Sequence, residues 1–146
     1  MCAFYSIHPE VAGGLGERTE MDTTRSPPEV HTLHYEFDGW LGDDLLSSHP
    51  CYIVSEQLKR VLESSKLTGF RLDDVCTSKS DQFKELQSTK ELPTFYWLKV
   101  EGEPGSDDFG ISDKYELIVS DAALDLMNDN TLEQAMIEEY EPEEET

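Results

Sequence analysis

Apolar residues occur in this chain as short runs separated by Gly, Pro and acidic segments, and this spacing limits the fold more than any other feature. Short runs rich in aromatic and β-branched side chains are typical of strands. Within 30–37, Leu33, Tyr35 and Phe37 alternate with polar residues, which is the period of a strand with one buried face. The sequence therefore predicts strands at 2–7, 30–37, 51–54, 95–100 and 115–119, and an extended segment at 70–75.

Serine residues that precede amphipathic segments predict helix starts, because the Ser side chain accepts a hydrogen bond from a backbone N–H of the first turn. Apolar residues at helical spacing follow Ser55, which predicts a helix that runs to about Ser65. Ser80 and Ser120 predict short helices directly after them, and Asn130 begins a capping-box pattern. Because helix and strand signals do not alternate regularly, we expect an α+β fold with a mostly antiparallel sheet and a few short helices.

The length suits a single domain, and we place its folded α+β body at residues 1–137. Residues 9–29 contain Gly and Pro without periodicity, so we expect a long loop there and interpret 13–16 as a flexible turn. Residues 40–46 mix large apolar groups with carboxylates and fit either a short helical turn or an irregular binding loop. Residues 138–146 hold six Glu and a Pro, which predicts a disordered acidic tail.

The chain is strongly acidic, with 32 Asp and Glu against 11 Lys and Arg and a formal charge of −21. Six of these acids lie in 138–146, so −15 remains on residues 1–137 and the acidity belongs to the body as well as to the tail. Binding to nucleic acid or to an anionic membrane requires basic patches that attract the phosphates. We therefore expect neither as a partner.

The sequence also predicts the compartment. No apolar stretch approaches the roughly 20 residues needed to cross a bilayer, and the first residues lack the basic and apolar regions of a signal peptide. Cys2, Cys51 and Cys76 form an odd set without paired spacing, which indicates thiols in a reducing environment. We expect a cytoplasmic protein without disulfides.

Metal and catalytic signatures are weak. The carboxylate pairs do not follow the calcium-loop spacing, and His49 with Cys51 supplies too few ligands for structural zinc, so we expect no metal and no cofactor. Neither these residues nor His8, His31 and His34 belong to a recognisable nucleophile and base signature, so we do not expect an enzyme. We interpret His34, on the polar face of its predicted strand, as exposed or in contact with a partner.

Acidic pairs beside aromatic residues favour a docking face for a basic protein, because complementary charge speeds association and buried aromatic anchors hold a complex. Trp40 is the candidate anchor, with a core position as its alternative. An adjacent Asp pair can also form a turn that caps backbone amides. The predicted partner-binding residues are Trp40, Asp43, Asp44, Asp73, Asp74, Asp107 and Asp108.

Short motifs between residues 4 and 127 carry a likeness to known proteins. They are 39–46 (GWLGDDLL), 50–56 (PCYIVSE), 67–75 (LTGFRLDDV), 92–98 (LPTFYWL), 107–110 (DDFG) and 117–120 (LIVS). In these motifs the chain resembles small bacterial cytosolic proteins similar to the immunity proteins of polymorphic toxin systems. The resemblance implies a protein that binds and neutralises a cognate toxin, in many cases basic, within the producing cell. It supplies no catalytic residues.

Other function classes stay open at this point. An acidic regulatory or adaptor protein would bind a host protein instead of a toxin. A mimic of nucleic acid would space its carboxylates like phosphates along one face. A small hydrolase or transferase would need a pocket in which a His lies within hydrogen-bond reach of a nucleophile or an acid.

Overall fold

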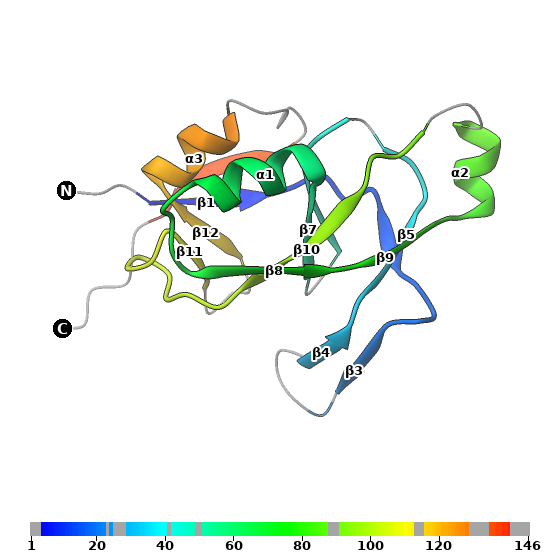
Figure 1. The fold of residues 1–146 in the computed structure, drawn as a ribbon, viewed down its shortest axis with the longest axis horizontal. Coiled ribbons are helices and arrows are strands. Elements are labelled where there is room, and N and C mark those ends of the chain that lie inside the picture. The colour runs from blue at the N-terminus through cyan, green and yellow to red at the C-terminus, as the bar shows by residue number, and fades with distance from the viewer. Residues whose placement is uncertain are drawn as a thin grey trace.

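The computed structural model describes residues 4–22, 24, 29–40, 42–48, 51–87, 91–112, 116–128 and 135–140. These residues form two four-stranded sheets, a three-stranded sheet, a two-stranded hairpin and three short helices. In Figure 1 the chain extends from α1, α3 and β1 on the left to α2 on the right. The structure confirms a single α+β domain with mostly antiparallel strands.

Sheet A is one of the two four-stranded sheets and is fully antiparallel. Its strands, in spatial order, are β11 (Phe109–Ile111), β12 (Leu117–Ser120), β1 (Phe4–His8) and β13 (Met136–Tyr140). Helix α3 (Asp121–Asn128) follows β12 directly and packs back on β12 and β1. The end strand β13 therefore has one neighbour, β1, among the described strands.

Sheet B is the second four-stranded sheet and is also antiparallel. Its strands, in spatial order, are β6 (Leu45–Ser48), β7 (Cys51–Ser55), β10 (Phe95–Val100) and β8 (Phe70–Asp74). Helix α1 (Glu56–Ser64) follows β7 without a loop and packs on β7 and β10.

Sheet C joins β2 (Gly13–Leu15), β5 (His34–Phe37) and β9 (Cys76–Lys79), and its β5–β9 pair is parallel. Only Val75 separates β8 from β9, so one extended segment leaves sheet B and enters sheet C. Helix α2 (Asp81–Leu86) follows β9. The hairpin of β3 (Glu20–Asp22) and β4 (Glu29–Thr32) projects away from the three sheets (Figure 1).

Sheet B has an apolar core on each face. Val54 and Leu98 join one core with sheet A and with helices α1 and α3. Ile53 and Trp97, their neighbours along β7 and β10, join a second core with Tyr35 of sheet C and with α2. Strands that are buried on both faces read as continuous apolar runs, which explains the apolar runs at 51–54 in β7 and 95–98 in β10. Burying each large side chain contributes about 1.5–3 kcal/mol.

The predicted helix starts are confirmed. The Ser55, Ser80 and Ser120 hydroxyls accept hydrogen bonds from backbone N–H groups three residues further along, at 3.3, 3.2 and 3.1 Å. Helix α1 ends at Ser64, next to the predicted limit at Ser65.

The predicted loop at 9–29 is wrong, because β2 and β3 lie within it. Strand β2 pairs with β5, and a Cβ atom on Gly13 would lie 1.9 Å from the Glu36 carbonyl oxygen. Glycine is therefore required by close strand approach and does not mark a flexible turn there. The predicted strand at 30–37 is two strands separated by Leu33, and in the 40–46 segment β6 begins at Leu45.

The predicted tail begins too early, inside the structured part of the chain. Residues 138–140 belong to β13 and pair with β1, so the body extends past residue 137. The rest of the predicted tail, 141–146, and the capping-box pattern at Asn130 lie outside the described residues. Within the described part of the chain, no helix has the length and apolar character needed to cross a membrane.

Candidate functional site

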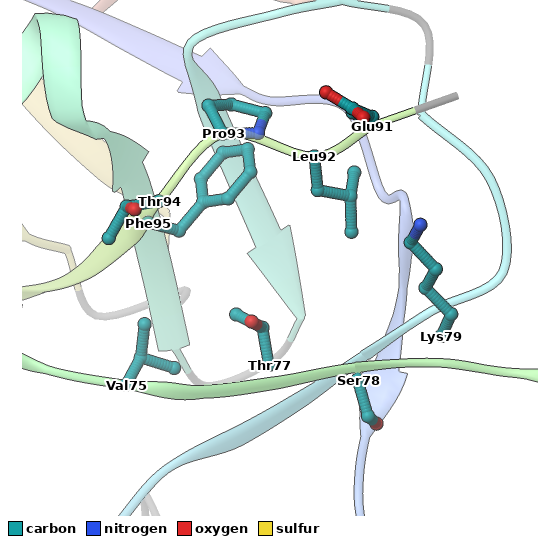
Figure 2. A pocket seen from close by; sticks show the side chains of 9 residues that line it. All are labelled: Val75, Thr77, Ser78, Lys79, Glu91, Leu92, Pro93, Thr94 and Phe95. Carbon is teal, nitrogen blue, oxygen red and sulfur yellow. The ribbon is translucent and has the colours of Figure 1, made fainter. Parts of the chain in front are cut away.

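A groove opens where two paired strands separate. The pairing of β8 with β10 ends at Asp74 and Tyr96. Beyond it, β9 turns to join sheet C, while residues 91–94 run alone toward β10, and a hollow of about 490 Å³ lies between the two segments (Figure 2). We call it the β9 groove; it is lined by Val75, Thr77, Ser78, Lys79, Glu91, Leu92, Pro93, Thr94 and Phe95.

The two sides of β9 have different surroundings. Figure 2 shows Val75, Thr77 and Lys79 pointing toward the 91–95 segment, whereas Ser78 points away from it. Phe95 is 3% exposed and belongs to the second core, where its ring lies 5.2 Å from that of Phe37. The groove thus combines an apolar base with hydroxyl groups and one charge of each sign, which suits non-covalent contact.

The Ser78 side chain meets an imidazole on the opposite face of sheet C. His34 Nε2 lies 2.7 Å from Ser78 Oγ, and His34 Nδ1 accepts a hydrogen bond from the Arg18 N–H at 3.2 Å. Because Nδ1 accepts, the ring proton is on Nε2, and that N–H donates to Ser78. His34 in this tautomer cannot take the proton of Ser78, so the pair is not arranged for nucleophilic catalysis.

The structure corrects the prediction that His34 is exposed or contacts a partner. The residue is 5% exposed, because the loop at 16–19 covers this face of sheet C. A Cβ atom on Gly16 would lie 2.2 Å from His34 Nδ1. Gly16, interpreted above as part of a flexible turn, was the sequence signal for this close contact.

Asp43 and Asp44 are buried, at 0% and 8% exposure, and the structure removes them from the predicted contact surface. Ser55 Oγ donates a 2.6 Å hydrogen bond to Asp44 Oδ1, and the Ser55 N–H donates to the Asp44 carbonyl at 2.8 Å. Asp44 therefore fixes the residue at which β7 ends and α1 begins. Charged groups are buried at low cost only when they are hydrogen-bonded in this way.

Trp40 is half-buried and packs with the second core. Its ring lies edge-on to Phe95 at 5.8 Å, and its Nε1–H donates to the Asp43 carbonyl at 2.9 Å. Its backbone exchanges two hydrogen bonds with the Gln87 amide. The residue also lines two other hollows, one of which shares residues 91–93 with the β9 groove, so part of the indole stays accessible.

Asp107 and Asp108 are half-buried and hold a loop in place. Asp108 accepts hydrogen bonds from the Thr68 N–H at 2.9 Å and from Ser120 Oγ at 2.6 Å. Asp107 accepts from the Glu103 N–H at 2.8 Å. These bonds match the alternative that an Asp pair caps backbone amides within a turn.

Asp73 and Asp74 are the exposed members of the predicted set and lie on β8 at the edge of sheet B. A hydrogen bond from Lys99 Nζ, 2.8 Å from Asp73 Oδ2, holds the pKa of the Asp73 carboxyl below its ordinary value. The structure therefore distributes the seven predicted residues over separate elements and does not gather them into one face.

A group of acidic residues lies on sheet A and α3, and the sequence analysis singled out only Glu138 and Glu139 among them, as part of the predicted tail. Residues 115–146 contain eleven Asp and Glu and no Lys, Arg or His, and β1 and β11 contain no Lys or Arg. The nearest cation along the chain, Lys114, is outside the described residues. We call this part of the surface the sheet A end; its exposed acids are Asp121, Asp125, Glu138 and Glu139.

Cations are concentrated near sheet B instead. Lys59 and Arg60 form ion pairs with acids of α1, and Arg71 and Lys99 do so with Glu101 and Asp73. The strands and the helix of the sheet A end carry no Lys or Arg of their own, so the local charge there is negative. The signal in the sequence was the run of residues after 114 without a cation.

Within the described ranges, no group of three or more His, Cys, Asp or Glu side chains is placed to hold a metal ion. Comparison of the chain with family models, curated proteins and solved structures found no match of any kind. The resemblance to immunity proteins accordingly stays a prediction.

Proposed function

We propose that this protein is a stoichiometric inhibitor that binds a basic toxin domain in the cytoplasm of the producing cell, as an immunity protein does. The observation that supports it best is the sheet A end, where exposed carboxylates stand on sheet and helix residues without an intervening Lys or Arg. Such a surface attracts a cationic partner and repels nucleic acid. Many substrate-binding faces of nucleic-acid-cutting enzymes are basic, because they bind phosphates.

The proposed mechanism is occupation of the partner's substrate-binding face. Acidic side chains of the inhibitor would take the place of substrate phosphates, and apolar contacts would slow dissociation. Electrostatic steering raises association rates toward roughly 10⁸–10⁹ M⁻¹s⁻¹ at low salt and weakens as salt screens the charges. Binding in this mechanism needs no chemical step from the inhibitor.

The test is co-expression with the toxin encoded by the neighbouring gene. We expect the two proteins to co-purify at equal stoichiometry, and the inhibitor to restore growth of cells that express the toxin. The association rate should fall about tenfold or more between 50 and 500 mM salt. A pair that does not co-purify, and a toxin that stays toxic, would refute the proposal.

Two matched variants test the place of binding. Asp125→Lys with Glu138→Lys reverses two charges at the sheet A end, and Glu20→Lys with Glu85→Lys reverses two exposed charges on β3 and α2. Both double variants change the net charge equally. The first should slow association with the toxin several-fold more than the second, and equal rates would show that only the total charge matters.

A further inference from the structure

Among the described strands, β13 ends sheet A, and its outer edge pairs with none of them. It is five residues long, and β1 is its neighbour in the spatial order of the described strands. No backbone hydrogen bond joins its outer side to another described residue. Met136 and Ile137 in this strand are 65% and 38% exposed. Natural sheets protect such edges with charged side chains, especially Lys, and with Pro, bulges or a covering segment. Strand β13 carries two charged side chains of the same sign, Glu138 and Glu139, but no Lys, no Pro and no bulge.

Other sheet edges of the molecule are better protected. The outer strand β8 of sheet B carries Arg71 and Asp73, each in an ion pair. On the opposite side of sheet B, Glu10 bridges to Leu46 and accepts a hydrogen bond from the Ser47 N–H at 3.0 Å. Strand β11 has only three residues. Among these described end strands, β13 is the one that combines a five-residue edge without a strand partner on its outer side with exposed apolar side chains.

The register with β1 decides which side chains an added strand would meet. Ile137 and Glu139 lie opposite Ile7 and Tyr5 and share the core-facing side of the sheet. Met136 and Glu138 point to the other side. Tyr140, opposite Phe4, shares the side of Met136 and Glu138. Along the strand two apolar residues are followed by two acids, so a complementary strand would carry two consecutive basic residues next to two consecutive apolar ones.

A second copy of this chain is a poor occupant. An antiparallel two-fold pairing centred on Glu138, or between Glu138 and Glu139, would set carboxylates directly opposite each other, at about 5 Å between Cβ atoms. Each copy would add the eleven acids of residues 115–146. Like charges in direct opposition destabilise strand pairing, whereas Lys or Arg in the same positions stabilises it.

We propose that β13 is a docking edge for an extended basic segment of the partner protein, which joins sheet A as a fifth strand. This inference rests on the proposed function, because it names the part of the surface to which the toxin would bind. Main-chain hydrogen bonds supply affinity in this mode of recognition, and the alternating side chains supply specificity. The acids of β13 select a cationic strand.

The probe is a seven-residue peptide with blocked ends in which two consecutive lysines are followed by two consecutive valines, and its control has the same composition with valine and lysine in alternation. Fluorescence anisotropy of the labelled peptides measures affinity, and amide hydrogen exchange of the full chain locates the contact. We expect the peptide with paired lysines to slow exchange at 136–140 and to bind several-fold more tightly than the alternating peptide.

Matched variants separate the edge from general charge attraction. Glu138→Lys with Glu139→Lys should weaken binding of the peptide with paired lysines about tenfold, and the glutamine versions should weaken it less. The control variant, Glu20→Lys with Glu85→Lys, should weaken it less than twofold. Circular dichroism melting checks that the variants are folded.

Each outcome decides one of the two proposals. Three results with the peptide would overturn the docking edge: no saturable binding at 1 mM, slowed amide exchange outside 136–140, or equal effects of the two lysine variants. The docking edge would also be overturned if the protein self-associates and the β13 amides are already protected from exchange without peptide. If the peptide protects β13 but the co-expressed toxin stays toxic, the docking edge stands and the inhibitor function falls. If the toxin is neutralised equally by wild type and by Glu138→Lys with Glu139→Lys, the function stands and the edge falls.

Discussion

Replacement of Asp108 by Ala tests whether this acid is structural or available to a partner. The carboxylate accepts hydrogen bonds from the Thr68 N–H at 2.9 Å and from Ser120 Oγ at 2.6 Å. A hydrogen bond to a charged group contributes about 1.5–3 kcal/mol, and we take the lower value for each bond because Asp108 is half-exposed. The Ser120 hydroxyl also caps α3 and would lose its acceptor. Asp108→Ala should therefore lower the free energy of unfolding by about 3 kcal/mol.

The assay is urea unfolding at pH 7, followed by tryptophan fluorescence. Asp74→Ala is the matched control, because it removes the same charge from an exposed side chain that accepts no hydrogen bond from the described residues. The control should change the free energy of unfolding by less than about 0.5 kcal/mol, with the same denaturant slope. If the two variants unfold within about 0.5 kcal/mol of each other, the structural role is refuted and Asp108 returns to the candidate contact residues.

Three further predictions concern packing, a thiol and pH. Gly13→Ala should cost about 1–3 kcal/mol of unfolding free energy, because its methyl group would overlap the Glu36 carbonyl, whereas Gly14→Ala, with open space around it, should be nearly neutral in the same urea assay. Burial raises the pKa of Cys51 to about 12, so mass spectrometry should find its thiol unmodified by iodoacetamide near pH 8 in the folded protein and modified in urea; rapid labelling of the folded protein would contradict this. The lysine partner of Asp73 lowers the pKa of this carboxyl from 3.8, so its stabilisation is present above about pH 4 and is lost as the pH falls through the lowered value. Asp73→Asn should therefore lose less stability than wild type on acidification below pH 4, and identical acid unfolding curves would contradict the ion pair.

Local signals predicted the elements whose cause is local. Ser55, Ser80 and Ser120 each accept a bond from an N–H three residues away, so a short window of sequence contains the whole interaction. The strand of Gly13 gave no such signal, because its pairing partner in β5 lies more than twenty residues further along the chain. Glycine there reflects how closely two strands approach, which spacing along the sequence does not reveal.

The candidate site was harder to predict for the same reason. Asp43 and Asp44 form the kind of acidic pair that is usually solvated, and it is the Ser55 hydroxyl, eleven residues after Asp44, that makes burial of Asp44 acceptable. Asp107 and Asp108 likewise bond to residues of distant segments. The charge of the sheet A end could have been found from sequence, since it is a matter of counting cations after Lys114. Its position beside a strand edge required the pairing of β13 with β1.

The segment that forms β8 and β9 also has a consequence for unfolding. Its first half hydrogen-bonds to β10 and its second half to β5, with Val75 alone between them. If sheet B unfolded, β8 would no longer hold the start of β9 in place, and if sheet C unfolded, β9 would no longer hold the end of β8. The two cores should consequently melt together, in one cooperative transition, and the slowest-exchanging amides of β5 and β10 should report a common free energy of opening.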